Sequence, residues 1–178
     1  MRVTDAVAMI GAGFDSGAAE VWADLGCGRG TFTLALAQLL AESSTIHAMD
    51  TDAAALRALP PNHDGVAIRR WHVDFLATAW PVADLDGVLM ANSLHFAPDQ
   101  RAVVRTCASH MRGAHRFLIV EYDFERAIPW VPHPVGRRAL RTLFEDSGYG
   151  SITMLGSRRS TYHRADLYAA LVEGPPSR

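Results

Sequence analysis

Residues 21–31 read Val-Trp-Ala-Asp-Leu-Gly-Cys-Gly-Arg-Gly-Thr and are the most informative part of the sequence about the fold. Its first part is mostly apolar, Asp24 stands near the end of that part, and three alternate glycines follow at Gly26, Gly28 and Gly30. Glycine has no Cβ, so it adopts positive φ readily and lets the backbone approach a ligand closely. The stretch therefore predicts a buried strand that ends in a ligand-binding loop, with the Asp24 carboxylate at the carboxyl end of the strand.

The glycine spacing and a second strand narrow the choice of ligand. The spacing is Gly-x-Gly-x-Gly, whereas the loop that seats a dinucleotide pyrophosphate reads Gly-x-Gly-x-x-Gly, so an NAD-dependent oxidoreductase is the weaker alternative. Residues 44–50, Ser-Thr-Ile-His-Ala-Met-Asp, predict a strand whose terminal Asp50 lies twenty residues after Gly30. A carboxylate there suits the hydroxyls of a ribose. The alternative interpretation of Asp50 is a polar cap before a helix that begins near Asp52.

The run from Asp24 to Gly30 resembles the first motif of the class I methyltransferases that use S-adenosylmethionine (SAM) and release S-adenosylhomocysteine. The Asp24 carboxylate could bind the ammonium group of such a cofactor through a charge-assisted hydrogen bond. The resemblance places Asp74, after the next strand, beside the adenine amino group; the alternative is an exposed acid in a turn. Phe75 could stack on adenine or belong to the core. The predicted cofactor-binding residues are Asp24, Gly26, Cys27, Gly28, Gly30, Asp50, Thr51, Asp74, Phe75 and Asn92.

Strands and helices alternate along the chain, which indicates an α/β fold. The further predicted strands are residues 66–73, 85–91 and 115–121, the helices are residues 31–42, 53–59, 98–111 and 135–147, and an antiparallel hairpin is formed by residues 151–158 and 165–172. Pro98 is expected at the first position of its helix. The resemblance implies a Rossmann-like, doubly wound sheet of seven strands, five of them parallel, with the hairpin at the C-terminal end. Residues 1–20 are a short N-terminal segment in which a helix could fold over the cofactor as a lid.

The composition of the chain limits the number of domains, the classes of partner and the catalytic chemistry that can be expected. With 178 residues, 49% hydrophobic and 20% charged, the chain is expected to form one domain, residues 1–178. The net charge of −2 argues against nucleic acid and against anionic lipid as partners. All seventeen basic residues are arginines, so lysine chemistry is excluded. Two cysteines make no disulfide framework, so we expect a cytoplasmic protein. No run approaches eighteen apolar residues, so we expect no membrane span. The expected oligomeric state is a monomer or homodimer.

Residues 91–96, Ala-Asn-Ser-Leu-His-Phe, follow the fourth strand, near the expected position of the transferable methyl group. The segment resembles members of the family that modify small metabolites, and it lacks the Pro-Pro pair of enzymes that methylate nucleobase amines. Asn92 could bind cofactor or substrate. His95 is the predicted general base, because a histidine accepts a proton near neutral pH. A packed structural histidine is the alternative.

The predicted substrate residues follow the fifth strand, because ligands bind at the carboxyl ends of strands in open α/β sheets. Tyr122 and Asp123 end that strand, and Trp130 and His133 lie in the proline-rich run that comes next. Trp130 could instead pack on the body of the protein. A polar cluster in the hairpin turn could bind an anionic substrate or could be a solvated turn; it comprises Arg158, Arg159, Tyr162, His163 and Arg164.

The sequence thus predicts a SAM-dependent methyltransferase that acts on a small-molecule nucleophile. The histidines and acids fit no recognised zinc spacing, so no metal is expected. The alternative function is a SAM-binding module or partner subunit without catalytic activity, because the cofactor motif is better defined than the substrate site.

Overall fold

The computed structural model describes residues 1–15, 17–76, 79–159 and 165–174. Tyr162, His163 and Arg164 of the predicted polar cluster therefore lie outside the described residues. The strands are β1 (Val21–Leu25), β2 (Thr45–Asp50), β3 (Asn62–His63), β4 (Val66–His72), β5 (Gly87–Ala91), β6 (Arg116–Tyr122), β7 (Ser151–Arg159) and β8 (Asp166–Glu173). The helices are α1 (Val3–Ile10), α2 (Thr31–Ala37), α3 (Ala53–Ala58), α4 (Gln100–His110) and α5 (Arg137–Asp146), with 3-10 turns η1 (Gly11–Gly13) and η2 (Leu94–Phe96).

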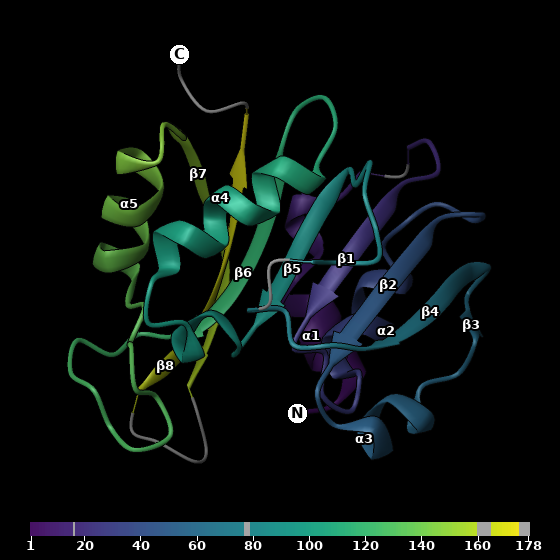
Figure 1. Cartoon of the computed structure of the whole chain (residues 1–178), viewed down its shortest axis with the longest axis horizontal. Coiled ribbons are helices and arrows are strands. Elements are labelled where there is room, and N and C mark those ends of the chain that lie inside the picture. Colours follow the sequence, from purple (N-terminus) through teal and green to yellow (C-terminus); the bar gives the residue numbers. More distant parts are fainter. Residues whose placement is uncertain (16, 77–78, 160–164, 175–178) are drawn as a thin grey trace.

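All the described strands join one sheet in the order β3-β4-β2-β1-β5-β6-β8-β7. Strands β4, β2, β1, β5 and β6 pair in parallel, and their carboxyl ends point to the lower edge in Figure 1. Strand β8 runs antiparallel to both β6 and β7, so the predicted C-terminal hairpin is confirmed. Because the strand order reverses between β1 and β5, the crevice for a ligand is expected at the carboxyl ends of these two strands.

The α/β, doubly wound fold is confirmed, and the predicted count of seven strands is corrected to eight among the residues that the structure describes. The additional strand is β3, which pairs antiparallel with β4 through a two-residue turn at Asp64 and Gly65. Both turn residues have positive φ, 49° and 79°, as the tightest hairpin turns require. Two residues are too short a run to show strand periodicity in a sequence.

Helix α4 starts later than predicted. It begins at Gln100, and the Asp99 side chain caps it by accepting a hydrogen bond from the Ala102 N–H at 2.9 Å. The prediction that Pro98 occupies the first helical position is therefore wrong. An aspartate is the better cap, because its carboxylate satisfies an N–H group that has no partner within the helix. Asp52 caps α3 in the same way, since its side chain accepts hydrogen bonds from the N–H groups of Ala54 and Ala55.

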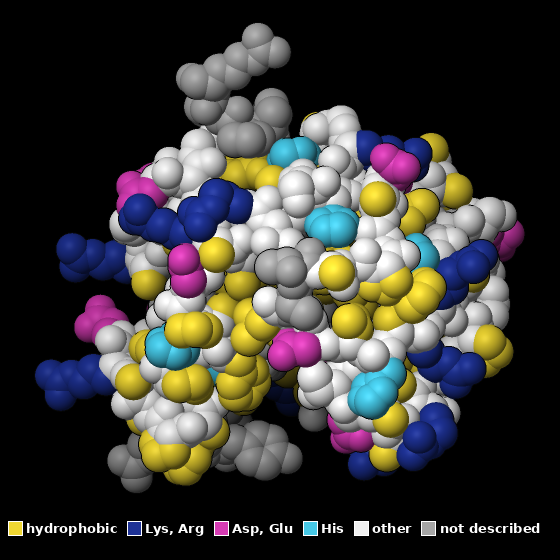
Figure 2. Space-filling model, viewed as in Figure 1, with side chains coloured by type: hydrophobic (Ala, Val, Ile, Leu, Met, Phe, Trp, Pro, Cys, Tyr) yellow, Lys and Arg dark blue, Asp and Glu magenta, His cyan; other side chains and the backbone are white. Residues whose placement is uncertain are grey.

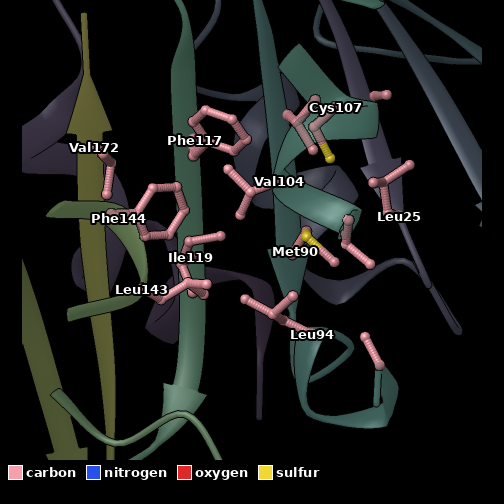
Figure 3. Packing of buried hydrophobic residues seen from close by; sticks show 14 of the residues in the cluster. Leu25, Met90, Leu94, Val104, Cys107, Phe117, Ile119, Leu143, Phe144 and Val172 are labelled. Carbon is pink, nitrogen blue, oxygen red and sulfur yellow. The ribbon is translucent and has the colours of Figure 1, made fainter. Parts of the chain in front are cut away.

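Helices cover both faces of the sheet (Figure 1). Helices α4 and α5 lie on one face, and α1 and α2 lie on the other. Figure 3 shows Val104 of α4 and Phe144 of α5 directed at Phe117 of β6. The Phe117 and Phe144 rings meet edge to face with centroids 5.0 Å apart, a favourable aromatic geometry. This double cover fixes the strands, so the loops at their carboxyl ends project from a rigid frame.

The N-terminal segment contains a helix, as predicted, at Val3–Ile10. Helix α1 packs against α2 and against β7, with Ala6 and Ile10 completely buried. Within the described ranges, no helix has both the length and the apolar composition needed to cross a bilayer. On the face shown in Figure 2, arginines and carboxylates are scattered rather than gathered in one patch.

Candidate functional site

The glycine loop is held by the ends of β1 and β2. The N–H groups of Gly26 and Cys27 both donate to the Met49 carbonyl, at 2.9 and 3.0 Å, and the Gly28 N–H donates to Asp50 Oδ2 at 2.7 Å. Asp50 Oδ1 accepts from the Asp52 N–H at 2.8 Å. Asp50 therefore ties the loop to the start of α3, as the cap interpretation predicts. Each carboxylate oxygen retains a second lone pair that can bind a ligand hydroxyl.

The three glycines are required for different reasons. All have positive φ, between 51° and 83°. A Cβ at Gly26 would lie 2.7 Å from Ser93 Cβ, and one at Gly30 would lie 2.0 Å from Leu59 Cδ2, so these two positions pack against protein. A Cβ at Gly28 meets nothing within 4 Å. Since Gly28 lines a cavity, its open side is space in which a ligand can lie against the backbone.

Two cavities flank this loop. The first, of about 400 Å³, is lined by Met1, Asp24, Gly26, Cys27, Gly28, Arg29, Thr31, Phe32, Ala91, Asn92, Tyr122, Arg158, Arg159 and Leu167. The second, of about 260 Å³, is lined by Gly26, Asp50, Thr51, Val73, Asp74, Phe75, Leu76, Asn92, Ser93 and Phe96. Gly26 and Asn92 line both cavities, so the two form neighbouring halves of one crevice. Their sizes suit a small-molecule site.

Asp24 is buried in the wall of the first cavity. Its side chain is 1% exposed, and its Oδ2 accepts a hydrogen bond from the Thr33 hydroxyl at 2.6 Å. Its Oδ1 is buried and has no hydrogen-bond partner among the described residues. Burial raises the pKa of Asp24 from 3.8 to about 7, with the charge of Asp50 adding to this effect and the bond from Thr33 opposing it. An ammonium group beside Oδ1 would satisfy this acceptor and favour its charged form.

Asn92 offers a second acceptor at the junction of the cavities. It has a positive φ of 55°, and its backbone N–H donates to the Val120 carbonyl at 2.8 Å. Within the described part of the chain, Asn92 Oδ1 and the neighbouring Ser93 Oγ are buried without hydrogen-bond partners. Buried polar atoms without partners are uncommon in folded proteins and call for an explanation such as a bound ligand. Both atoms belong to residues that line the second cavity.

The residues predicted for the adenosine half lie together. Thr51, Asp74 and Phe75 line the second cavity with Asp50. Asp74 is exposed, and its Oδ1 accepts from the Leu76 N–H at 2.9 Å, as in the alternative turn interpretation. Phe75 is half-buried and packs against the core as well as lining the cavity.

Cys27 is buried, and its Sγ donates to the Gly28 carbonyl across 3.7 Å. Burial, followed by the charges of Asp24 and Asp50, raises the pKa of this thiol well above its usual value. The thiol is therefore protonated near neutral pH and is a poor nucleophile.

The predicted base, His95, is not among the described lining residues of either cavity, and its ring packs against that of Phe96, a lining residue of the second cavity, with centroids 4.3 Å apart. Its side chain is 4% exposed, and its Nδ1 lies 2.6 Å from Oε2 of Glu121, whose side chain is 1% exposed. The His95 backbone N–H donates to Glu121 Oε1 at 3.1 Å. This double contact clamps η2, and with it the segment that carries Asn92, to β6. Glu121 is not among the predicted site residues; the one signal for it in the sequence is a carboxylate at the end of an otherwise apolar strand.

The predicted substrate residues separate into two groups. Tyr122 lines the first cavity. Asp123 is exposed and accepts a hydrogen bond from the Arg137 N–H at 2.9 Å, which fixes the start of α5. It lines a different hollow of about 670 Å³ between α4 and α5. Trp130, 55% exposed, and the exposed His133 line neither half of the crevice.

Comparison with known proteins agrees with this geometry. A family model described as a methyltransferase domain matches residues 23–113. A SAM-dependent methyltransferase from Methanosarcina mazei is similar in structure, with a TM-score of 0.65 at 13% identity over 90% of this chain and 94% of that one. A comparison with curated proteins finds no match.

Two further structures share the fold. The magnesium protoporphyrin IX methyltransferase of Synechocystis, solved with bound SAM, has a TM-score of 0.59 at 18% identity over 89% of this chain and 71% of that one. An arsenic(III) SAM methyltransferase from Chlamydomonas reinhardtii has a TM-score of 0.64 at 16% identity over 99% of this chain and 73% of that one. Because the family model spans half of its length, the chain belongs to the methyltransferase domain family, with the class I fold and SAM as its cofactor.

Proposed function

We propose that the protein transfers the methyl group of SAM to a nucleophilic atom of a small molecule. The observation that carries this proposal is the pair of unpartnered buried oxygens, Asp24 Oδ1 and Asn92 Oδ1, on the walls of a crevice with an open glycine face at Gly28. Asp24 would hold the methionine ammonium of SAM. Gly26, Cys27, Gly28 and Gly30 would shape the loop beneath the methionine portion.

The adenosine portion belongs in the second cavity under this proposal. Asp50 would accept hydrogen bonds from the ribose hydroxyls with the lone pairs that the loop amides leave unused. Thr51, Asp74 and Phe75 would line the adenine edge. Asn92 lies between the halves, which is where the sulfonium centre would lie if the two portions occupy these cavities.

When bound, SAM would supply an electrophilic methyl carbon, which an in-line nucleophile could attack while S-adenosylhomocysteine leaves with the electron pair of the broken carbon–sulfur bond. The protein's contribution is to hold the acceptor on the axis of that bond, and such positioning can supply about 7–11 kcal/mol of the barrier reduction. Tyr122 would contact the acceptor, because it lines the first cavity from the end of β6. His95 would stabilise the Asn92 segment through its clamp with Glu121, and its role as a base remains a prediction.

A small acceptor is favoured by the size of the crevice and by charge. A site for nucleic acid needs a basic stripe, and the net charge of the chain is −2. Similar structures include enzymes named for a porphyrin and for arsenic(III), which are small substrates.

A SAM-binding module without catalysis is the second candidate, favoured because the predicted base His95 is not among the described residues that line the two halves of the crevice. Incubation with tritium-labelled SAM and a panel of hydroxyl, thiol, amine and carboxylate compounds separates the two. Transfer of label to any small compound, lost in Asp24→Ala, supports the enzyme. SAM binding without transfer to any of them favours the module.

A further inference from the structure

Three arginines make the first cavity cationic. Arg29, Arg158 and Arg159 line it, whereas Asp24 is the one carboxylate among its described lining residues. The SAM cofactor bears one carboxylate against an ammonium and a sulfonium, so its binding adds a further positive charge. A hollow lined by one sign of charge attracts ligands of the opposite sign. With the cofactor bound, the positive charges of the three arginines and of the cofactor would therefore still outnumber the negative charges in the cavity.

Strand pairing places Arg158 on the far side of the cavity from the glycine loop. Arg158 of β7 pairs with Leu167 of β8, which pairs in turn with Tyr122 of β6. All three residues line the first cavity. In the sheet order, β7 lies four strands from β1, which is roughly 19 Å at the usual strand spacing. Arg158 thus lies beyond Tyr122, on the acceptor side rather than beside the predicted position of the methionine carboxylate.

Asp5 of α1 orients the Arg158 side chain. Arg158 Nη1 lies 2.8 Å from Asp5 Oδ2, and Arg2 contacts the same carboxylate with Nη2 at 3.1 Å from Oδ1. Two guanidinium groups therefore share one carboxylate, so their charge is only half compensated. A guanidinium has five N–H donors in a planar fork that matches a carboxylate, and the contact with Asp5 occupies one edge. The Arg158 side chain is 46% exposed and keeps access to solvent-borne ligands.

We propose that Arg158, oriented by Asp5 and assisted by the charge of Arg159, forms a subsite that binds a carboxylate group of the methyl acceptor. This rests on the proposed function, and it assigns the substrate class: small acids rather than neutral compounds. The competing explanation is that Arg158 only ties the hairpin to α1 through its contact with Asp5.

The test uses the full-length chain saturated with S-adenosylhomocysteine and measures binding of matched acid and amide pairs by saturation-transfer NMR and calorimetry. The pairs are benzoate with benzamide, 4-hydroxybenzoate with 4-hydroxybenzamide, and succinate with succinamide. At least one acid should bind tenfold or more tightly than its amide. The Arg158→Gln/Arg159→Gln double variant should lose this preference while its affinity for S-adenosylhomocysteine stays within threefold of wild type.

Two further variants separate recognition from a structural tie. Arg141→Gln removes a guanidinium from an exposed ion pair with Glu145 on α5, and it should leave acid binding unchanged. Asp5→Asn removes the contact that orients Arg158 but keeps Arg158 and Arg159, so the preference for acids should be reduced yet stay larger than in Arg158→Gln. Loss of the preference to the same extent in Asp5→Asn and Arg158→Gln overturns the proposal, and so does equal binding of acids and amides by wild type. Failure of wild type to bind S-adenosylhomocysteine would instead refute the proposed function on which the subsite rests.

Discussion

Replacement of Asp24 by asparagine should make the free protein more stable at neutral pH and less able to bind SAM. The wild-type carboxyl group is buried, and its pKa of about 7 lies about three units above its ordinary value of 3.8. Between these values the folded state keeps a proton that the unfolded state has lost. The contribution of Asp24 to the free energy of unfolding therefore falls as pH rises from about 4 to about 7. Above pH 7 this contribution is constant.

The size of the effect follows from the shift. One pKa unit corresponds to about 1.4 kcal/mol, so ionisation of Asp24 lowers the free energy of unfolding by up to about 4 kcal/mol between pH 4 and pH 7. An asparagine at this position does not titrate, and its side-chain oxygen can still accept the bond from the Thr33 hydroxyl. The difference in stability between Asp24→Asn and wild type should therefore grow with pH, in favour of the variant.

Urea denaturation of both proteins without ligand, at intervals between pH 4 and pH 7.5, measures this difference. Comparison of the two proteins cancels the titration of the other groups. A difference that stays the same across the pH range would mean that Asp24 ionises alike in the folded and unfolded states, which contradicts a raised pKa in the folded protein. SAM binding should show the opposite preference: wild-type affinity should rise between pH 5.5 and pH 7, and the variant should bind at least tenfold more weakly.

Three other substitutions test separate contacts. Gly28→Ala projects a methyl group into open space at a φ of 51°, so SAM affinity should fall at least tenfold in calorimetry, while the strain of a positive φ in alanine, about 1 kcal/mol, should lower the thermal midpoint by only a few degrees. Asp50→Ala removes the acceptor of the Gly28 N–H, and should weaken SAM binding by about 2–3 kcal/mol; unchanged affinity would exclude Asp50 from the site. Glu121→Leu leaves the buried His95 without its partner, so urea denaturation should show a loss of about 1–3 kcal/mol; wild-type stability would show that the clamp is dispensable.

The sequence predicted the glycine loop and its partner strand well, because the determining features are local. Three alternate glycines, a buried strand before them and Asp50 at the end of the next strand all lie within thirty residues. The parallel register of β1 and β2 then brings Asp50 to the loop without further information. The positions of the loop glycines and of Asp50 are therefore determined by the strand–loop–helix unit to which they belong.

The contacts that escaped prediction join distant parts of the chain. Glu121 lies 26 residues from His95, and nothing in either local pattern indicates that they bond. Arg158 and Asp5 come from opposite ends of the chain and meet only because β7 packs beside α1. The proline-rich segment around Trp130 is the opposite case. Its composition predicts contact with the substrate, but Trp130 lines neither half of the crevice, because the position of the segment relative to the crevice depends on how the whole sheet folds.

Calorimetric titration of the purified protein with SAM, S-adenosylhomocysteine and NADH shows whether the crevice around the glycine loop binds an adenosyl cofactor. We expect micromolar binding of both adenosyl compounds, about −8 kcal/mol, with no heat from NADH and with SAM binding at least tenfold weaker in Asp24→Asn. Binding of NADH alone, or absence of binding by both adenosyl compounds, would contradict it.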